Sequence, residues 1–309
     1  MKSLPNTMKL LIILAFALAM VLPASGLAEV RIVATVGDLA AMAREVAGGD
    51  AVVDLLARPS EDPHFVDPKP SYVRRLARAD VLVYTGVDLE IGWLPTLLIG
   101  SRNAALQPGQ PGNFDASHHV VLQGVAAGPV DRSMGDVHPG GNPHYTTDPR
   151  QMARVALAFG QTMGRIDPDN APAYRERARN FARDCIRTAQ RWEEHFAQLP
   201  ANARKFVSYH EAFNYVASWL GLEDVIRIEP KPGIAPNPRH VARVVEAIKS
   251  QKIRLILQSE YYPLSTANIL AQQTGAKIVV IAAQTREDQR YVEHIDHVVS
   301  LIFEGLHEH

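Results

Sequence analysis

The feature that most constrains the fold is a stretch from Asp169 to Pro200 whose apolar residues recur at steps of three and four. That period places them on one face of a helix, and the stretch is long enough for about eight turns. Asp169 or Asn170 can cap its start, Pro172 suits its first turn, and Pro200 follows its end. The sequence therefore predicts one long helix, named here the spine helix.

Short runs of Val, Ile and Leu alternate with helical patterns on both sides of the spine helix. The runs that we expect to be strands are 30–36, 51–57, 80–86, 204–209, 223–228, 252–258 and 277–282. Alternation of this kind is typical of parallel sheets with right-handed crossovers. We therefore predict an α/β fold of two lobes, each with a mainly parallel sheet flanked by helices, joined by the one long spine helix.

The 309 residues suffice for two domains. We expect an N-terminal α/β lobe over 29–168, the linking helix over 169–200 and a C-terminal α/β lobe over 201–309. The alternative is an ordinary long surface helix within one domain, which helical periodicity alone does not exclude. Between 100 and 147 the pattern gives way to Gly, Pro, Asn and Asp, and a loop of that length is usually functional or disordered.

The first 28 residues have the layout of a secretory signal peptide. Lys2 and Lys9 precede an apolar run over 10–22, and small residues lead to Ala28. A membrane anchor is the alternative, but the run is short for a bilayer. We expect cleavage after Ala28 and a soluble exported protein of the periplasm.

Charge and cysteine content exclude some other classes of protein. The net charge of −1 and the charged fraction of 21% give no indication of a nucleic-acid surface. Cys185 is the only cysteine, so no internal disulfide can form, and its place on the apolar face of the spine helix favours a core residue. We expect a monomer.

Four ionisable residues could meet where the two lobes face each other. His64 follows the second strand, His210 follows the strand 204–209, Glu260 follows the strand 252–258, and His144 lies in the long loop. Ligands of open parallel sheets bind at the carboxyl ends of strands. Taken singly, the histidines could be solvated and Glu260 could cap a helix or pair with a cation. Together, three imidazoles and a carboxylate suit Zn²⁺, whereas Mn²⁺ prefers more carboxylates.

Three motifs resemble those of the periplasmic solute-binding proteins of zinc and manganese ABC importers, the cluster with a rigid interlobe helix. They read EDPHFVDPKPSYVRRLARADVLVYTGVDLEIGWL, NPHYTTDPRQMA and FVSYHEAFNYVASWLGLE, in that order. The resemblance covers the mature chain and implies that His64, His144 and His210 are metal ligands. Zinc members of the family tend to have histidine at the third position. It also implies capture of Zn²⁺ for an ABC transporter membrane permease, without catalysis.

The chain departs from the family pattern at several positions. The family's usual fourth ligand is an aspartate after the last strand, where this sequence has Gln284 or Thr285. Glu260, water or Asp288 could replace it, and we favour Glu260. Asn142 and Thr146 replace the usual Asp and Trp of the second motif. Instead of a long histidine-rich loop there are only three scattered residues, His118, His119 and His138; of these, His138 competes with His144 for the second ligand position.

Two other functions remain open. A secreted zinc hydrolase is suggested by His210 followed by Glu211, but a metalloprotease helix would need a histidine where Asn214 stands. Capture of an organic ligand would need aromatic or arginine anchors that the sequence does not reveal. A Mn²⁺-binding protein of the same type is the alternative within the family.

Overall fold

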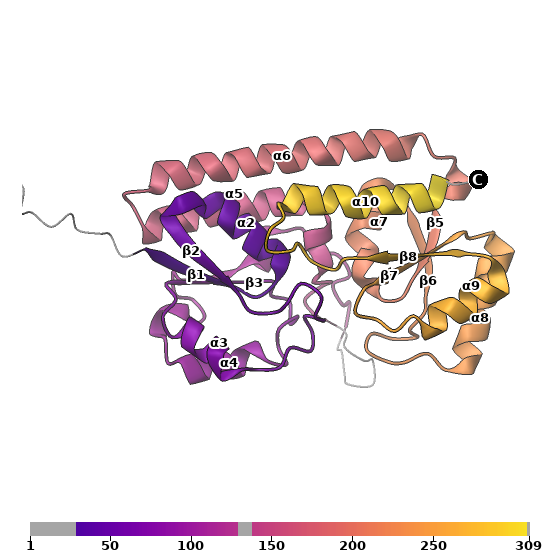
Figure 1. Cartoon of the computed structure of the whole chain (residues 1–309), viewed down its shortest axis with the longest axis horizontal. Helices are drawn as coiled ribbons and strands as arrows, with labels where there is room; N and C mark the ends of the chain where they lie inside the picture. Colours follow the sequence, from indigo (N-terminus) through magenta and orange to yellow (C-terminus); the bar gives the residue numbers. More distant parts are fainter. Residues whose placement is uncertain (1–28, 129–137, 308–309) are drawn as a thin grey trace, which may run out of the picture.

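Two four-stranded parallel sheets form the framework of the molecule (Figure 1). The structure, a computed structural model, describes residues 29–128 and 138–307. In the first sheet the order is β2-β1-β3-β4, and in the second it is β6-β5-β7-β8. The strands are β1 Val30–Ala34, β2 Ala51–Leu55, β3 Val81–Tyr84, β4 Asn113–Asp115, β5 Lys205–Ser208, β6 Glu223–Arg227, β7 Leu255–Ser259 and β8 Lys277–Ile281. The predicted α/β fold of two sheets is confirmed, and the two sheets repeat one topology.

Helices cover both faces of each sheet. They are α2 Gly37–Ala47, α3 Pro70–Leu76, α4 Leu94–Ser101, α5 Pro149–Ile166, α6 Ala171–Ala197, α7 Asn214–Leu220, α8 Pro238–Gln251, α9 Ser265–Thr274 and α10 Tyr291–His307. Alternate strand residues enter different cores, because successive side chains of a strand point to opposite faces. Ile32 joins a core shared by both lobes, whereas Val33 packs against α3 and α4. Likewise Phe206 joins the shared core and Val207 packs towards α8 and α9.

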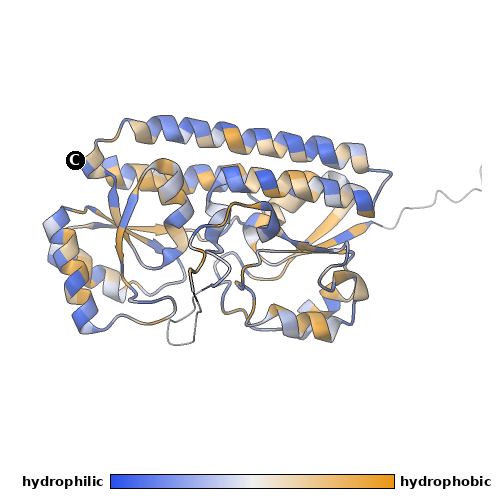
Figure 2. Ribbon diagram, turned by 180° about the vertical axis from the view of Figure 1, so that it is seen from behind, coloured by the Kyte–Doolittle hydropathy of each residue, from blue (hydrophilic) through white to orange (hydrophobic). Residues whose placement is uncertain are grey.

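The spine helix is α6, with 27 residues and therefore a length of about 40 Å. It passes above both sheets and carries a mixture of hydrophilic and hydrophobic residues along its length (Figures 1 and 2). Phe181, Cys185 and Phe196 on its inner face are buried in the shared core, as their spacing predicts. Asn170 precedes its first turn without a side-chain capping bond. The predicted domain limits at 168 and 200 stay predictions.

The two lobes also meet directly beside the start of α2. Asp38 accepts hydrogen bonds on Oδ1 from the backbone N–H of Thr285 at 2.8 Å and from its hydroxyl at 2.7 Å. Gln284 accepts one from the backbone N–H of Asp38 at 3.1 Å. At Gly37 an added Cβ would lie 2.3 Å from the carbonyl oxygen of Thr285, so only glycine allows this approach. Gln284 and Thr285, where the resemblance implies an aspartate ligand, thus make contact between the lobes.

The region 100–147, which has no periodic pattern in the sequence, contains secondary structure that the sequence analysis did not predict. Strand β4 lies within it and pairs with β3, and a 3-10 helix, η5 over His144–Thr147, precedes α5. Three residues are too few to show a strand period. The predicted signal peptide, 1–28, lies outside the described residues. In the part of the chain that the structure describes, no helix combines the length and hydropathy needed to cross a membrane.

Candidate metal centre

Three predicted ligands, His64, His144 and His210, come together between the two sheets. His64 follows β2, His144 begins η5, and His210 comes directly after β5 and Tyr209. Each ring offers one nitrogen to a group whose members all lie within 4.8 Å of one another. Nε2 of His144 and Nε2 of His210 are 3.1 Å apart. The arrangement of three converging imidazoles is one that can hold a single divalent metal ion.

Two carboxylates orient these rings from behind. Oδ1 of Asp62 accepts a hydrogen bond from Nδ1 of His64 at 2.7 Å and another from its backbone N–H at 3.0 Å. Oε1 of Glu229 accepts a hydrogen bond from Nδ1 of His210, and both side chains are buried. A bond of this kind fixes the tautomer and leaves the lone pair of Nε2 for a metal. The sequence reasoning missed both carboxylates, although Glu229 follows β6 and the strand-end rule could have found it.

Asn142 holds His144 in place and ties it to the second lobe. Its Oδ1 accepts from the backbone N–H of His144 at 2.9 Å, and its Nδ2 donates to the carbonyl of Glu211 at 2.8 Å. The hydroxyl of Tyr215 donates to the Asn142 carbonyl at 2.9 Å. Asn142, where the resemblance implies an aspartate, therefore links the loop before α5 to the segment after His210.

Burial and neighbouring charge favour the neutral form of the His144 ring. Burial, followed by repulsion from His210 and His64, holds the pKa of His144 well below its usual value. Burial would raise the pKa of Asp62, but its hydrogen bond with His64 and the charge of that ring outweigh burial and lower it. Because a metal binds the neutral imidazole, His144 needs to lose no proton at neutral pH.

The fourth predicted residue, Glu260, does not belong to this group of ligand atoms. Its Oε2 lies 3.4 Å from Nη2 of Arg286, and its Oε1 is buried without a hydrogen-bond partner among the residues that the structure describes. Asp288, the other carboxylate considered, is exposed. A ligand role for Glu260 stays a prediction.

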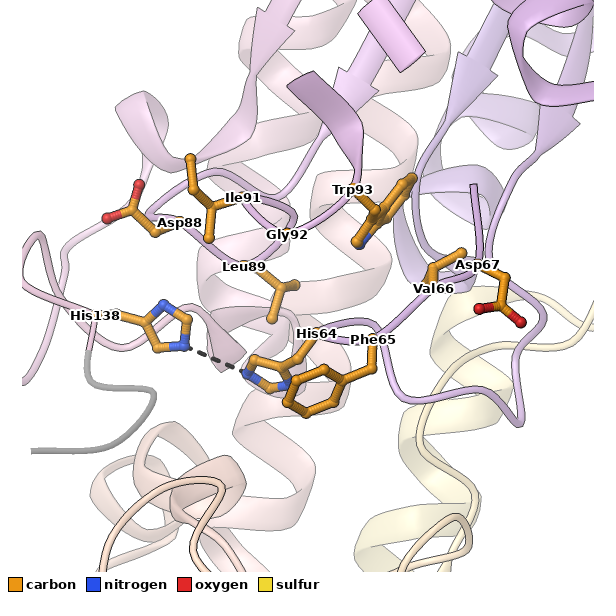
Figure 3. A pocket seen from close by; sticks show the side chains of 10 residues that line it. All are labelled: His64, Phe65, Val66, Asp67, Asp88, Leu89, Ile91, Gly92, Trp93 and His138. Atoms are coloured by element: carbon orange, nitrogen blue, oxygen red, sulfur yellow. Dashed lines mark hydrogen bonds between the residues drawn. The ribbon is translucent and has the colours of Figure 1, made fainter. Parts of the chain in front are cut away.

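A histidine that was only a competing candidate lies at the site instead. Nε2 of His138 is 3.3 Å from Nε2 of His64 (Figure 3). Both rings border an open cavity of about 730 Å³, lined also by Phe65, Asp88 and Trp93 among others. His118 is exposed and His119 stacks on the ring of Phe114, so neither faces the cluster.

Comparison with known proteins gives the family. The model of the family described as "Zinc-uptake complex component A periplasmic" matches residues 32–305. The chain belongs to this family. The zinc-binding lipoprotein AdcA of Streptococcus pneumoniae is 25% identical over 86% of this chain and 53% of its own length. The chain thus spans about half the length of that relative.

Other similar proteins are matched over nearly their full length. The manganese ABC transporter substrate-binding lipoprotein PsaA of Streptococcus pneumoniae is 21% identical over 96% of this chain and 97% of its own length. The crystal structure of ZnuA superposes with a TM-score of 0.75 at 18% identity, covering 90% of this chain and 99% of that one. At that identity the structural match establishes the fold only.

Proposed function

We propose that this protein captures Zn²⁺ outside the cytoplasmic membrane and delivers it to the membrane permease of an ABC transporter. His64, His144 and His210 are the proposed ligands. One observation carries the proposal: nitrogens of three histidines from distant parts of the chain lie within 4.8 Å of one another, where the two sheets face each other. The family description, which names zinc uptake and the periplasm, supports the same function and location.

The choice of Zn²⁺ over Mn²⁺ rests on the donor atoms. Imidazole nitrogens suit zinc, whereas manganese prefers carboxylate and water oxygens. The carboxylates of Asp62 and Glu229 are hydrogen-bonded to ligand histidines, so they act on the rings from behind. Mn²⁺ is the second candidate, because PsaA, a relative matched over nearly its full length, is named a manganese ABC transporter substrate-binding lipoprotein.

Binding without catalysis is the proposed activity, and the protein acts as a monomer. Glu211, the base that a hydrolase would need, follows His210 directly and begins the 3-10 helix η7, Glu211–Phe213. A metalloprotease places its two histidines one helical turn apart, and here Asn214 stands at that position.

Metal analysis of residues 29–309, purified without a histidine tag, tests the proposal. We expect about one equivalent of zinc, and a Zn²⁺ affinity higher than the Mn²⁺ affinity in competition with a chelator. Replacing His64, His144 or His210 by alanine should abolish tight binding. Full zinc affinity in all three variants would refute the ligand assignment, and peptide or ester hydrolysis lost in Glu211→Gln would favour the hydrolase.

A further inference from the structure

The ring of His138 packs against His64 as closely as the rings of His144 and His210 do. The centroid of the His64 ring lies 5.4 Å from that of His138, 5.3 Å from that of His144 and 5.5 Å from that of His210. His64 is therefore surrounded by three rings at nearly equal distance. His138 is itself buried, with 7% of its surface exposed.

One ring nitrogen of His138 points at His64. Nε2 of His138 faces Nε2 of His64, and the backbone of Val87 interacts with the His138 ring. A backbone carbonyl behind a histidine ring is a common device for directing the other nitrogen at a metal. Val87 has a φ of 44° and Asp88 a φ of 64°, a conformation that costs free energy for a β-branched residue such as valine. The turn after β3 thus carries the backbone group that interacts with His138.

Two nitrogen–nitrogen separations in the structure fit opposite edges of one tetrahedron. Four nitrogens at 2.0–2.1 Å from a zinc ion are about 3.3 Å apart. The Nε2 atoms of His64 and His138 are 3.3 Å apart, and those of His144 and His210 are 3.1 Å apart. The nitrogens of His64, His144 and His210 all lie within 4.8 Å of one another, and His138 is not part of that group. Its ring therefore has to move closer to His144 and His210 to complete a tetrahedral shell.

We propose, on the basis of the function proposed above, that His138 is the fourth ligand and that the cation is bound by four imidazoles. Four neutral rings leave the charge of the cation in place, and the carboxylates of Asp62 and Glu229 compensate for it from behind His64 and His210. A shell of nitrogen alone discriminates against Mn²⁺. His138 therefore sets the preference for zinc, and Glu260 remains paired with Arg286.

The test compares His138→Gln with Glu260→Gln and with His118→Gln as an exposed control, in the untagged chain. We measure Zn²⁺ and Mn²⁺ affinity by chelator competition and record the visible spectrum of the Co²⁺-loaded protein. We expect His138→Gln to weaken zinc binding about 10-fold or more, since the loss of even an outer partner of a metal site lowers affinity 10–100-fold. The ratio of Zn²⁺ affinity to Mn²⁺ affinity should become smaller, and the visible bands of the Co²⁺-loaded protein should change. The control should match the wild type in all three readouts.

The outcomes separate this proposal from the function itself. Wild-type affinity and an unchanged Co²⁺ spectrum in His138→Gln would overturn the four-histidine shell, and a loss in Glu260→Gln would assign the position to that carboxylate. Neither result affects the three-histidine site. That site fails only if the wild type binds no zinc or if His64→Ala, His144→Ala and His210→Ala bind it fully.

Discussion

Replacing Glu229 by glutamine tests how far the buried carboxylate behind His210 contributes to metal affinity. The two side chains are 3% and 4% exposed, so solvent does not screen their interaction. Glutamine has the same size, and its carbonyl oxygen can still accept the Nδ1 proton of His210. The variant therefore removes the charge and keeps the shape.

The size of the effect follows from the change in the hydrogen bond. A bond to a charged group contributes about 1.5–3 kcal/mol and a neutral one about 0.5–1.5 kcal/mol, so the variant loses about 1–1.5 kcal/mol. Because 1.4 kcal/mol corresponds to a factor of ten, zinc affinity should fall about tenfold. This lies at the lower end of the 10–100-fold range for partners of metal-bound histidines.

Competition with a chromophoric zinc chelator on the untagged chain measures the loss. Glu211→Gln is the matched control, because this glutamate is next to His210 and no side-chain hydrogen bond joins it to a ligand in the described part of the chain. The control should bind zinc as the wild type does. An affinity of Glu229→Gln within twofold of wild type would refute the argument that this carboxylate orients and polarises His210.

Three further predictions concern stability and reactivity. Gly37→Ala should lower the free energy of unfolding in urea by about 1–3 kcal/mol, because its Cβ would meet the carbonyl of Thr285. Gly49→Ala, with open space around it, should not lower it. Equal urea midpoints for the two variants would contradict the close contact between the lobes. Burial raises the pKa of Asp224 to about 6, so between pH 3.8 and about 6 the folded chain holds a proton that the unfolded chain has released. The free energy of unfolding therefore falls as the pH rises through this range, by at most about 3 kcal/mol. Asp224→Asn should flatten that part of the pH profile measured by thermal unfolding. An unchanged profile would show that Asp224 does not cause this pH dependence. The thiol of Cys185, fully buried and with its pKa raised by burial, should react with a thiol reagent only on unfolding; rapid labelling of the native chain would show that it is accessible.

The fold was predictable because its signals are local and periodic. The heptad-like spacing around Cys185 marks the buried face of α6, and the alternation of apolar runs with helices gives two parallel sheets. Strand β4 was not predictable, because three residues with one buried side chain carry no period. Its place in the sheet is fixed by pairing with β3, which is a tertiary effect.

The candidate site was predictable only where strand ends or motifs pointed to it. His64 and His210 follow strands, and His144 belongs to a recognisable motif, so all three could be named. His138 lies neither at the end of a strand nor in a recognisable motif, and only the fold brings it close to His64. Glu260 follows β7, as expected for a residue at the carboxyl end of a strand, yet its Oε2 faces Arg286. A position at a strand end therefore predicts which edge of the sheet a residue occupies, but it does not predict the direction of its side chain.

The most direct test of the central claim is the position of zinc in crystals of the metal-loaded protein, located by anomalous diffraction at the zinc edge. The account predicts one strong peak between the two sheets, bonded at about 2.0–2.1 Å to nitrogens of His64, His144 and His210 together. A peak bonded to fewer than three of these rings, or one found elsewhere on the molecule, would contradict it.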